Sequence, residues 1–173
     1  MRVAGQKRRC IDEGWFNGVA EHDGALYAAK YSESSIRVYE QAGGWKECRR
    51  IDLGCESQDI TISIHDNIIY ACLCGGAKLL AYSLSGEQIG SWGSKGNREA
   101  GELDHPYLCM TGTGGAVLIA DRGNDRLQVL GTDRQWSVVS LQPPVERPRS
   151  ALLHRGRLLV ASYWNTLYVY DQK

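Results

Sequence analysis

One pattern, two apolar runs joined by a short polar turn, occurs four times in this 173-residue chain and constrains its fold more than any other feature. The copies begin at Gly24, Asn67, Gly115 and Gly156, so their spacings are 43, 48 and 41 residues. Two apolar runs around a turn predict a β-hairpin. The chain is therefore built from four related units.

Further apolar runs flank the hairpins. One run precedes each hairpin, from Gly18, Ile60, Tyr107 and Ser150, and another follows the first three hairpins, from Trp45, Glu87 and Trp136. Each unit thus predicts four antiparallel strands, and its length is typical of one blade of a β-propeller. The second strand of every unit is apolar at nearly every position, which indicates a sheet covered on both faces. The predicted class is all-β: a β-propeller of about four four-stranded antiparallel blades, as a closed small ring or as part of a larger propeller.

The predicted blades cover about 13–53, 54–94, 95–142 and 143–173 of a single domain spanning 1–173. The fourth unit ends after its third strand, so residues 2–11 are a candidate for its outer strand, which would close the ring and remove two free edges. The alternative is an N-terminal tail beside a three-stranded blade, because residues 2–11 have a poor strand composition.

Charge and composition narrow the class of protein. The chain carries 20 Lys and Arg against 20 Asp and Glu, so no net charge directs it to nucleic acid or to an anionic membrane. No stretch approaches the roughly 20 apolar residues of a membrane span, and the first residues lack the apolar core of a secretory signal. We therefore expect a soluble, cytoplasmic protein with no membrane partner, whose six cysteines remain thiols.

Residues 91–130 form the most complete unit. Its recurring positions hold Gly93, Gly96, Gly101, Pro106, Asp121, Asn124 and Arg126. This stretch resembles the NHL-repeat family, whose repeat opens with a Gly-x-x-Gly turn, has a Pro at the start of its first strand and ends in an Asp, Asn, Arg hairpin. The other units depart from this pattern, with Lys30 and Leu73 in the place of Asp121, and Ser35 and Lys78 in the place of Arg126.

The resemblance implies a propeller that binds RNA or protein, often attached to a ubiquitin-ligase module in tripartite-motif proteins. A RING domain of such a module needs clustered Cys and His pairs, which this sequence lacks. The polar residues of the unit have a structural role, which we favour over a catalytic one. Gly123 and Asn124 suit positive φ in a tight turn, and Asp121 can pair with Arg126 across it.

Candidate ligand-binding residues gather at one rim of the predicted propeller, where the hairpin turns and the loops before the inner strands meet. They are Tyr31, Gln58, His105, Arg122, Tyr163 and Trp164. Cations beside stacking aromatic rings are what single-stranded RNA binding requires. We therefore expect this rim to be the binding face.

The sequence offers no catalytic, cofactor or metal motif. It contains neither a GxSxG elbow nor a phosphate-binding P-loop. His22, His65 and His154 share one repeat position, so they lie one per blade, too far apart to bind one zinc ion. Cys72 and Cys74 lie on a predicted buried strand, where thiols are inert. We therefore expect no catalytic residue, no cofactor and no metal.

These observations favour a non-catalytic NHL-like module that binds a protein or single-stranded RNA partner through its rim, in ubiquitin-ligase-type or post-transcriptional regulation. One alternative is a metal-dependent propeller hydrolase or lyase, in which His and carboxylate side chains would converge on the central channel. Another is a structural fragment of a larger protein. Self-association that completes the ring is a further way to cover the end blades.

Overall fold

The computed structural model describes residues 10–42, 44–55 and 59–171, which form three four-stranded sheets and one three-stranded sheet, all antiparallel. The first sheet contains β1 (Phe16–His22), β2 (Ala25–Lys30), β3 (Ser35–Glu40) and β4 (Lys46–Asp52). The second contains β5 (Ile60–His65), β6 (Ile68–Leu73), β7 (Lys78–Ser83) and β8 (Gln88–Trp92). The third contains β11 (Pro106–Thr111), β12 (Val117–Asp121), β13 (Arg126–Leu130) and β14 (Trp136–Val139). The fourth contains β15 (Pro148–His154), β16 (Arg157–Ser162) and β17 (Leu167–Asp171).

Short elements connect these sheets. A parallel pair, β9 (Ser94–Lys95) and β10 (Glu102–Leu103), lies between the second and third sheets, and two 3-10 turns, η1 (Thr113–Gly115) and η2 (Arg122–Asn124), lie within the third. No helix in the described part of the chain is long and apolar enough to cross a membrane.

Strand pairing follows the repeat. The first residue of each inner strand pairs with the last residue of the second strand: Phe16 with Lys30, Ile60 with Leu73, Pro106 with Asp121, and Pro148 with Ser162. Because the side-chain period of a strand is two, a shared register places equivalent residues on equivalent faces. The alignment of the four units predicted from the sequence is confirmed.

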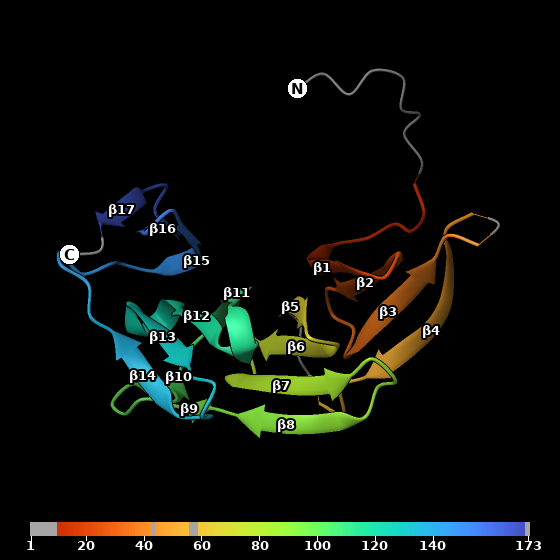
Figure 1. The fold of residues 1–173 in the computed structure, drawn as a ribbon, viewed down its shortest axis with the longest axis horizontal. Coiled ribbons are helices and arrows are strands. Elements are labelled where there is room, and N and C mark those ends of the chain that lie inside the picture. Colours follow the sequence, from red (N-terminus) through yellow and green to blue (C-terminus); the bar gives the residue numbers. More distant parts are fainter. Residues whose placement is uncertain (1–9, 43, 56–58, 172–173) are drawn as a thin grey trace, which may run out of the picture.

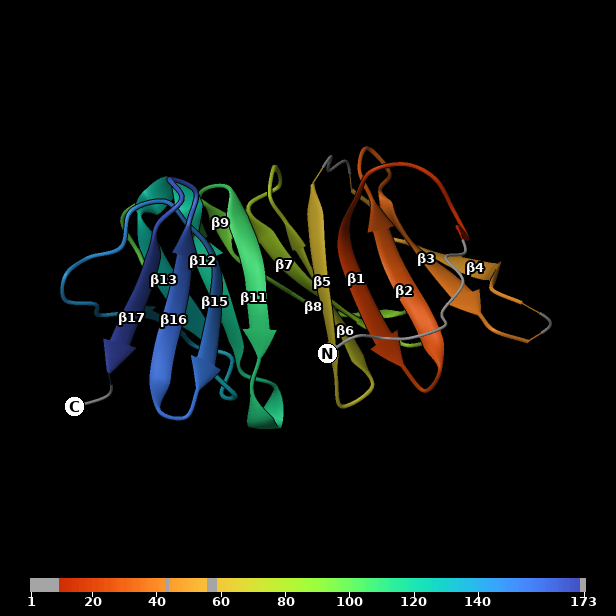
Figure 2. The ribbon, with the colours of Figure 1, turned by 90° about the horizontal axis from the view of Figure 1, so that it is seen from above.

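The four sheets form an arc around a central axis, with their inner strands toward the middle (Figure 1). β1 packs beside β5, β5 beside β11, and β11 beside β15, and Figure 2 shows β1 and β5 side by side. The predicted all-β propeller architecture is thus confirmed. Figure 2 also shows that the turns β2–β3, β12–β13 and β16–β17 lie along one edge of the arc, the upper rim, and the β1–β2 and β15–β16 turns along the opposite edge.

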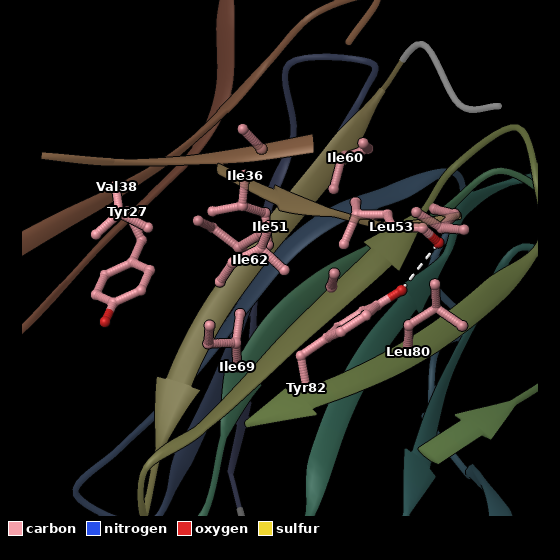
Figure 3. Packing of buried hydrophobic residues seen from close by; sticks show 13 residues of the cluster. Tyr27, Ile36, Val38, Ile51, Leu53, Ile60, Ile62, Ile69, Leu80 and Tyr82 are labelled. Atoms are coloured by element: carbon pink, nitrogen blue, oxygen red, sulfur yellow. Dashed lines mark hydrogen bonds between the residues drawn. The ribbon is translucent and has the colours of Figure 1, made fainter. Parts of the chain in front are cut away.

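Apolar cores lie between neighbouring sheets. In the first core, Tyr27 and Ile36 of the first sheet meet Ile69 and Tyr82 of the second, and the Tyr82 hydroxyl donates a hydrogen bond to the Leu53 carbonyl at 2.9 Å (Figure 3). Two similar clusters join the second sheet to the third and the third to the fourth. Each fully buried large apolar side chain contributes about 1.5–3 kcal/mol, so inter-sheet packing supplies much of the stability.

The two ends of the arc each present one sheet face that no other described sheet covers. On the first sheet Val19 is 69% exposed, and on the fourth sheet Leu152, Leu167 and Val169 are 54%, 65% and 55% exposed. The first face is partly covered by the preceding segment, because the Asp12 carboxylate accepts hydrogen bonds from Arg37 (2.7 Å) and from the Tyr39 hydroxyl (2.5 Å).

Two expectations about local structure need comment. Cys10 and Ile11 precede Asp12 beside the first sheet, whereas residues 2–9 lie outside the described residues, so an outer strand formed by residues 2–11 stays a prediction. The expected positive φ at Gly123 and Asn124 is wrong: both belong to η2, and Asp125 has the positive φ of 53°. The Asn124 side chain donates hydrogen bonds to Asp121 (2.8 Å) and to the Gly96 carbonyl (2.9 Å), which holds Asn124 within the turn.

Candidate functional site: an arginine and aromatic cluster at the channel mouth

The second residue of each inner strand faces the centre of the arc. These residues are Asn17, Thr61, Tyr107 and Arg149, and all four line one cavity of about 400 Å³. Thr61 and Tyr107 pair regularly with the second strand, whereas Asn17 and Arg149 lie in β-bulges of β1 and β15, and a bulge turns the side chain of its extra residue. The cavity is therefore a product of all four sheets and is the central channel of the propeller.

A hydrogen-bond network links three sheets around this channel. Asp59 accepts hydrogen bonds from the Asn17 amide at 2.8 Å and from the Tyr107 hydroxyl at 3.0 Å. The backbone amide of Leu108 donates to the Thr61 hydroxyl at 2.9 Å. These bonds hold the polar side chains of the first, second and third sheets in fixed positions.

Burial controls the protonation of groups behind the channel wall. Burial and the nearby Cys74 and Asp59 raise the pKa of Tyr107 well above its usual value, so its hydroxyl stays protonated and donates to Asp59. Burial also raises the pKa of Cys74 and, more strongly, that of Cys72. A protonated buried thiol is a poor nucleophile, as expected from the sequence.

Three arginines lie on aromatic rings at the mouth of the channel. The Arg122 guanidinium lies 5.4 Å from the ring centres of both Tyr107 and Tyr163, and Arg149 lies 5.7 Å from Tyr107. Arg147 lies 5.6 Å from the Trp164 ring. Tyr163 and Trp164 contact each other edge to face, with their ring centres 5.4 Å apart. We call Tyr107, Arg122, Arg147, Arg149, Tyr163 and Trp164 the rim cluster.

No carboxylate pairs directly with an arginine of the rim cluster in the described part of the chain. Arg122, Arg147 and Arg149 take part in none of its salt bridges, whereas Arg37, Arg126 and Arg157 each pair with a carboxylate. Arg147 and Arg149 are exposed, as are Tyr163 (46%) and Trp164 (57%). Cations over aromatic rings with free outer surfaces can hold an anionic group and a flat ring at once.

The structure brings together three of the six predicted rim residues, Arg122, Tyr163 and Trp164. Tyr31 lies on the first sheet, where its ring contacts Trp15 at 5.9 Å. His105 is exposed, and its ring bonds to the neighbouring Asp104 carboxylate at 2.7 Å. Gln58 lies outside the described residues.

The predicted binding residues left out the channel-lining Asn17, Asp59, Tyr107 and Arg149, together with Arg147, although Arg147 and Arg149 form a basic cluster in the sequence. A signal for them was present, because three of them stand at the second position of an inner strand and Asp59 immediately precedes one. The repeat alignment therefore marks them once the inner strand is taken as the channel wall.

The polar side chains of the third unit form a hydrogen-bond network around Asp121. Asp121 is fully buried and accepts hydrogen bonds from Arg126 (3.0 Å), Asn124 (2.8 Å), Gln128 (2.8 Å) and the Asp104 amide (2.7 Å). This network ties the loop before β11 to the β12–β13 turn. It thereby fixes the backbone of η2, the turn that carries Arg122.

The glycines and proline of this unit shape the same loop. Gly93 and Gly101 have φ of 93° and 87°, which favour glycine, and a Cβ on Gly93 would lie 2.7 Å from Leu103. Gly96 lies opposite Leu103, with its amide bonded to the Leu103 carbonyl at 3.2 Å, and Pro106 begins β11. The loop therefore folds tightly against the third hairpin.

The histidines are separated, as the repeat position predicts. His22, His65 and His154 end β1, β5 and β15, on the edge opposite the rim cluster. His22 and His65 each lie beside the next residue, Asp23 or Asp66, at 3.4 Å and 3.2 Å. In the described residues no three His, Cys, Asp or Glu side chains are grouped in a way that could hold a metal ion.

No protein-family model and no curated protein matches this chain. Its fold is similar to solved structures that are β-propellers. A streptogramin B lyase has 16% identity over 91% of this chain and 54% of its own, with a TM-score of 0.65. A Bacteroides thetaiotaomicron protein of unknown function has 15% identity over 91% of this chain and 48% of its own, with a TM-score of 0.75. BamB from Moraxella catarrhalis has 16% identity over 89% of this chain and 42% of its own, with a TM-score of 0.61.

This chain thus spans about half the length of these structures. A likeness at such low identity concerns the path of the backbone and carries no activity with it. The chain has the β-propeller fold.

Proposed function

We propose that this chain is a non-catalytic, NHL-like propeller module that binds single-stranded RNA through the rim cluster, in a post-transcriptional role. The observation that carries the proposal is the set of three arginines, unpaired with carboxylates in the described residues, that lie on aromatic rings at the channel mouth. Arg122 and Arg149 converge on Tyr107, and Tyr163 links Arg122 to Trp164.

Single-stranded RNA fits this chemistry better than a protein surface does. Guanidinium groups bind phosphates, and the exposed faces of Tyr163 and Trp164 offer platforms for unpaired bases. Stacking on such a ring is worth about 1–3 kcal/mol per base. The rim gathers three arginines on one face of a chain with no net charge, which favours contact with phosphates at this face.

The non-catalytic part of the proposal rests on the channel. Asp59, a carboxylate of the channel wall, already accepts bonds from Asn17 and Tyr107, and the nearby thiol of Cys74 has a raised pKa. A general base needs a free carboxylate or a neutral histidine within reach of the substrate. Among the described residues, the cavity lining contains Asp59 and no histidine.

The test is fluorescence anisotropy of a labelled ten-nucleotide single-stranded RNA at several salt concentrations. The double variant R122A/R149A should weaken binding and lower the slope of log K against log salt by about 1.4, or about 0.7 for each phosphate that the variant no longer binds. W164A should weaken binding by about 1–3 kcal/mol. The control is R157A, because Arg157 is an exposed arginine paired with Asp171 at 2.8 Å.

Two outcomes would contradict the proposal. Equal binding by wild type and R122A/R149A would remove the rim cluster from the interface. Binding of an acidic peptide but not of RNA, with the same dependence on Arg122 and Arg149, would keep the face and replace the partner by a protein.

A further inference from the structure

The outer edge of β17 has no partner strand in the described part of the chain, whereas β4, β8 and β14 complete the other three sheets. The amide of Ser162 donates to the Thr166 carbonyl at 2.8 Å and so closes the β16–β17 hairpin. Because hydrogen-bonded pairs alternate along an antiparallel ladder, the amides and carbonyls of Leu167, Val169 and Asp171 face the outer edge. These groups form a template for another strand.

An apolar cavity of about 600 Å³ lies beside this edge, between the third and fourth sheets. Its walls include Met110, Leu118, Val139, Leu141, Leu153 and Leu158. Its volume lies within the range of about 300–1,000 Å³ that is usual for ligand pockets. The free edge therefore adjoins space for side chains as well as free backbone groups.

The Tyr170 hydroxyl borders this cavity and is buried without a hydrogen-bond partner in the described residues. Burial raises the pKa of Tyr170, so the hydroxyl stays protonated. Buried polar side-chain atoms in native structures nearly always have a partner. We therefore expect the occupant of the cavity to supply a hydrogen bond to this oxygen.

The third sheet, which has a fourth strand, shows which kind of residue such a strand places opposite the equivalent of Tyr170. Leu127 pairs with Ala120 and Leu167 with Ala161, so Leu130 of β13 is equivalent to Tyr170 of β17. The cross-strand partner of Leu130 is Trp136 of β14, which packs into the core between the second and third sheets. The residue missing opposite Tyr170 is thus the counterpart of a tryptophan.

We infer that the β17 edge and its cavity bind an extended segment of a partner polypeptide as the fourth strand of the fourth sheet. The segment alternates apolar and polar residues and carries a tryptophan that enters the cavity opposite Tyr170. An indole N–H can donate to the Tyr170 oxygen, so one side chain fills the cavity and satisfies the hydroxyl. We assign the segment to a partner and not to the N-terminal part of this chain. Asp12, near the start of the described residues, is bonded to Arg37 of the first sheet, which lies at the opposite end of the arc from β17.

The probe is a synthetic peptide with the sequence of residues 134–142, RQWSVVSLQ, which is this chain's own outer strand in the third sheet. Isothermal titration should detect its binding to the full chain below about 1 mM, with Trp136→Ser in the peptide weakening binding tenfold or more. Backbone amides of Leu167, Val169 and Asp171 should gain protection from hydrogen exchange when the peptide binds.

V169P is the decisive variant. Val169 is 55% exposed and its amide faces the free edge, so proline removes no bond between β16 and β17 and the variant should fold. It should lose peptide binding by at least about tenfold, or about 1.4 kcal/mol. V169T, which keeps the amide, is the matched control and should bind as wild type does. Y170F should bind the peptide more weakly without lowering the melting temperature of the free protein.

Equal binding by V169P and wild type, or no binding of RQWSVVSLQ at about 1 mM, would overturn the inference. Binding that appears only after deletion of residues 1–9 would show that this chain's own N-terminal segment occupies the edge, and would also overturn it. The site is separate from the rim cluster, so R122A/R149A should bind the peptide normally. The two proposals can therefore fail independently.

Discussion

The hairpins β12–β13 of the third sheet and β16–β17 of the fourth share one strand register but differ in the bonds that hold them. At equivalent positions the third has Asp121, buried and bonded to Arg126, Asn124 and Gln128, whereas the fourth has Ser162, whose hydroxyl accepts a bond from the Trp164 amide at 3.1 Å. Leu127 of the third sheet is fully buried, whereas its counterpart Leu167 is 65% exposed.

The two turns therefore use their side chains differently. The third turn uses its polar side chains to fix its own backbone, and its Arg122 side chain lies on the rings of Tyr107 and Tyr163. The fourth turn lacks that network and presents Tyr163 and Trp164 to solvent. The polar side chains of the third turn therefore stabilise its hairpin, whereas the fourth turn leaves two aromatic rings exposed to solvent.

The largest effect should come from D121A compared with S162A. Removing the Asp121 carboxylate leaves the donors of Arg126, Asn124 and Gln128 unpaired, and breaking a buried ion pair from one side costs about 3–5 kcal/mol. S162A removes one exposed hydrogen bond and should cost about 0.5–1.5 kcal/mol at most. Urea denaturation gives both values. Similar losses for the two variants would contradict the distinction between the hairpins.

The next largest effect on stability should come from burial of one sheet face against the neighbouring sheet. L127A deletes a fully buried side chain in the core between the third and fourth sheets and should lower the free energy of unfolding by about 2–5 kcal/mol. L167A changes the equivalent position on the uncovered face and should change stability by less than about 0.5 kcal/mol.

Sedimentation of wild type and L167A at several concentrations extends this comparison. A marked destabilisation by L167A, together with a dimer that the variant abolishes, would show that a second copy covers the fourth sheet. That outcome would favour a ring completed by self-association.

The sequence predicted the blade pattern because strand pairing in a meander is local: the period, the apolar runs and the turns all lie within one unit. It even placed Lys30, Leu73 and Asp121 at equivalent positions, as the register confirms. The site was harder to predict, because Arg122 of the third sheet contacts Tyr163 of the fourth sheet, 41 residues later in the chain. The angle at which the two sheets pack brings these residues together, and no local sequence pattern encodes that angle.

Local conflicts limited the prediction as well. Glycine and asparagine in the DRGND turn favour positive φ, but the tertiary bonds from Asn124 to Asp121 and Gly96 displace the left-handed residue to Asp125. The sequence predicted Tyr107 only as the start of an inner strand. Its position beside Asp59 and beneath two arginines follows from neighbouring sheets, which a single unit does not contain.

The smallest effect is a loss of stability at alkaline pH. It should differ between the thiol of Cys109 in the third sheet and the phenol of Tyr170 in the fourth. Burial raises the pKa of Cys109 to about 12, whereas the thiol of the unfolded chain titrates near 9.0. Between these values the folded state holds a proton that the unfolded state has lost. The contribution of this one group to the free energy of unfolding is therefore constant below about pH 9 and falls above it, by at most about 1.4 kcal/mol per pH unit.

C109A should make that fall shallower from pH 9 upward, as measured by urea denaturation at intervals between pH 8 and pH 11. Cys72 and Cys74, whose pKa values are also raised by burial, keep part of the slope in the variant. Y170F should follow wild type until the unfolded tyrosine begins to titrate near 10.0 and become shallower only above it, because burial raises the pKa of Tyr170 from that value. Parallel loss of stability by C109A and wild type from pH 9 would show that the Cys109 thiol is not buried between the third and fourth sheets. That result would contradict the contrast between the covered third sheet and the uncovered fourth sheet.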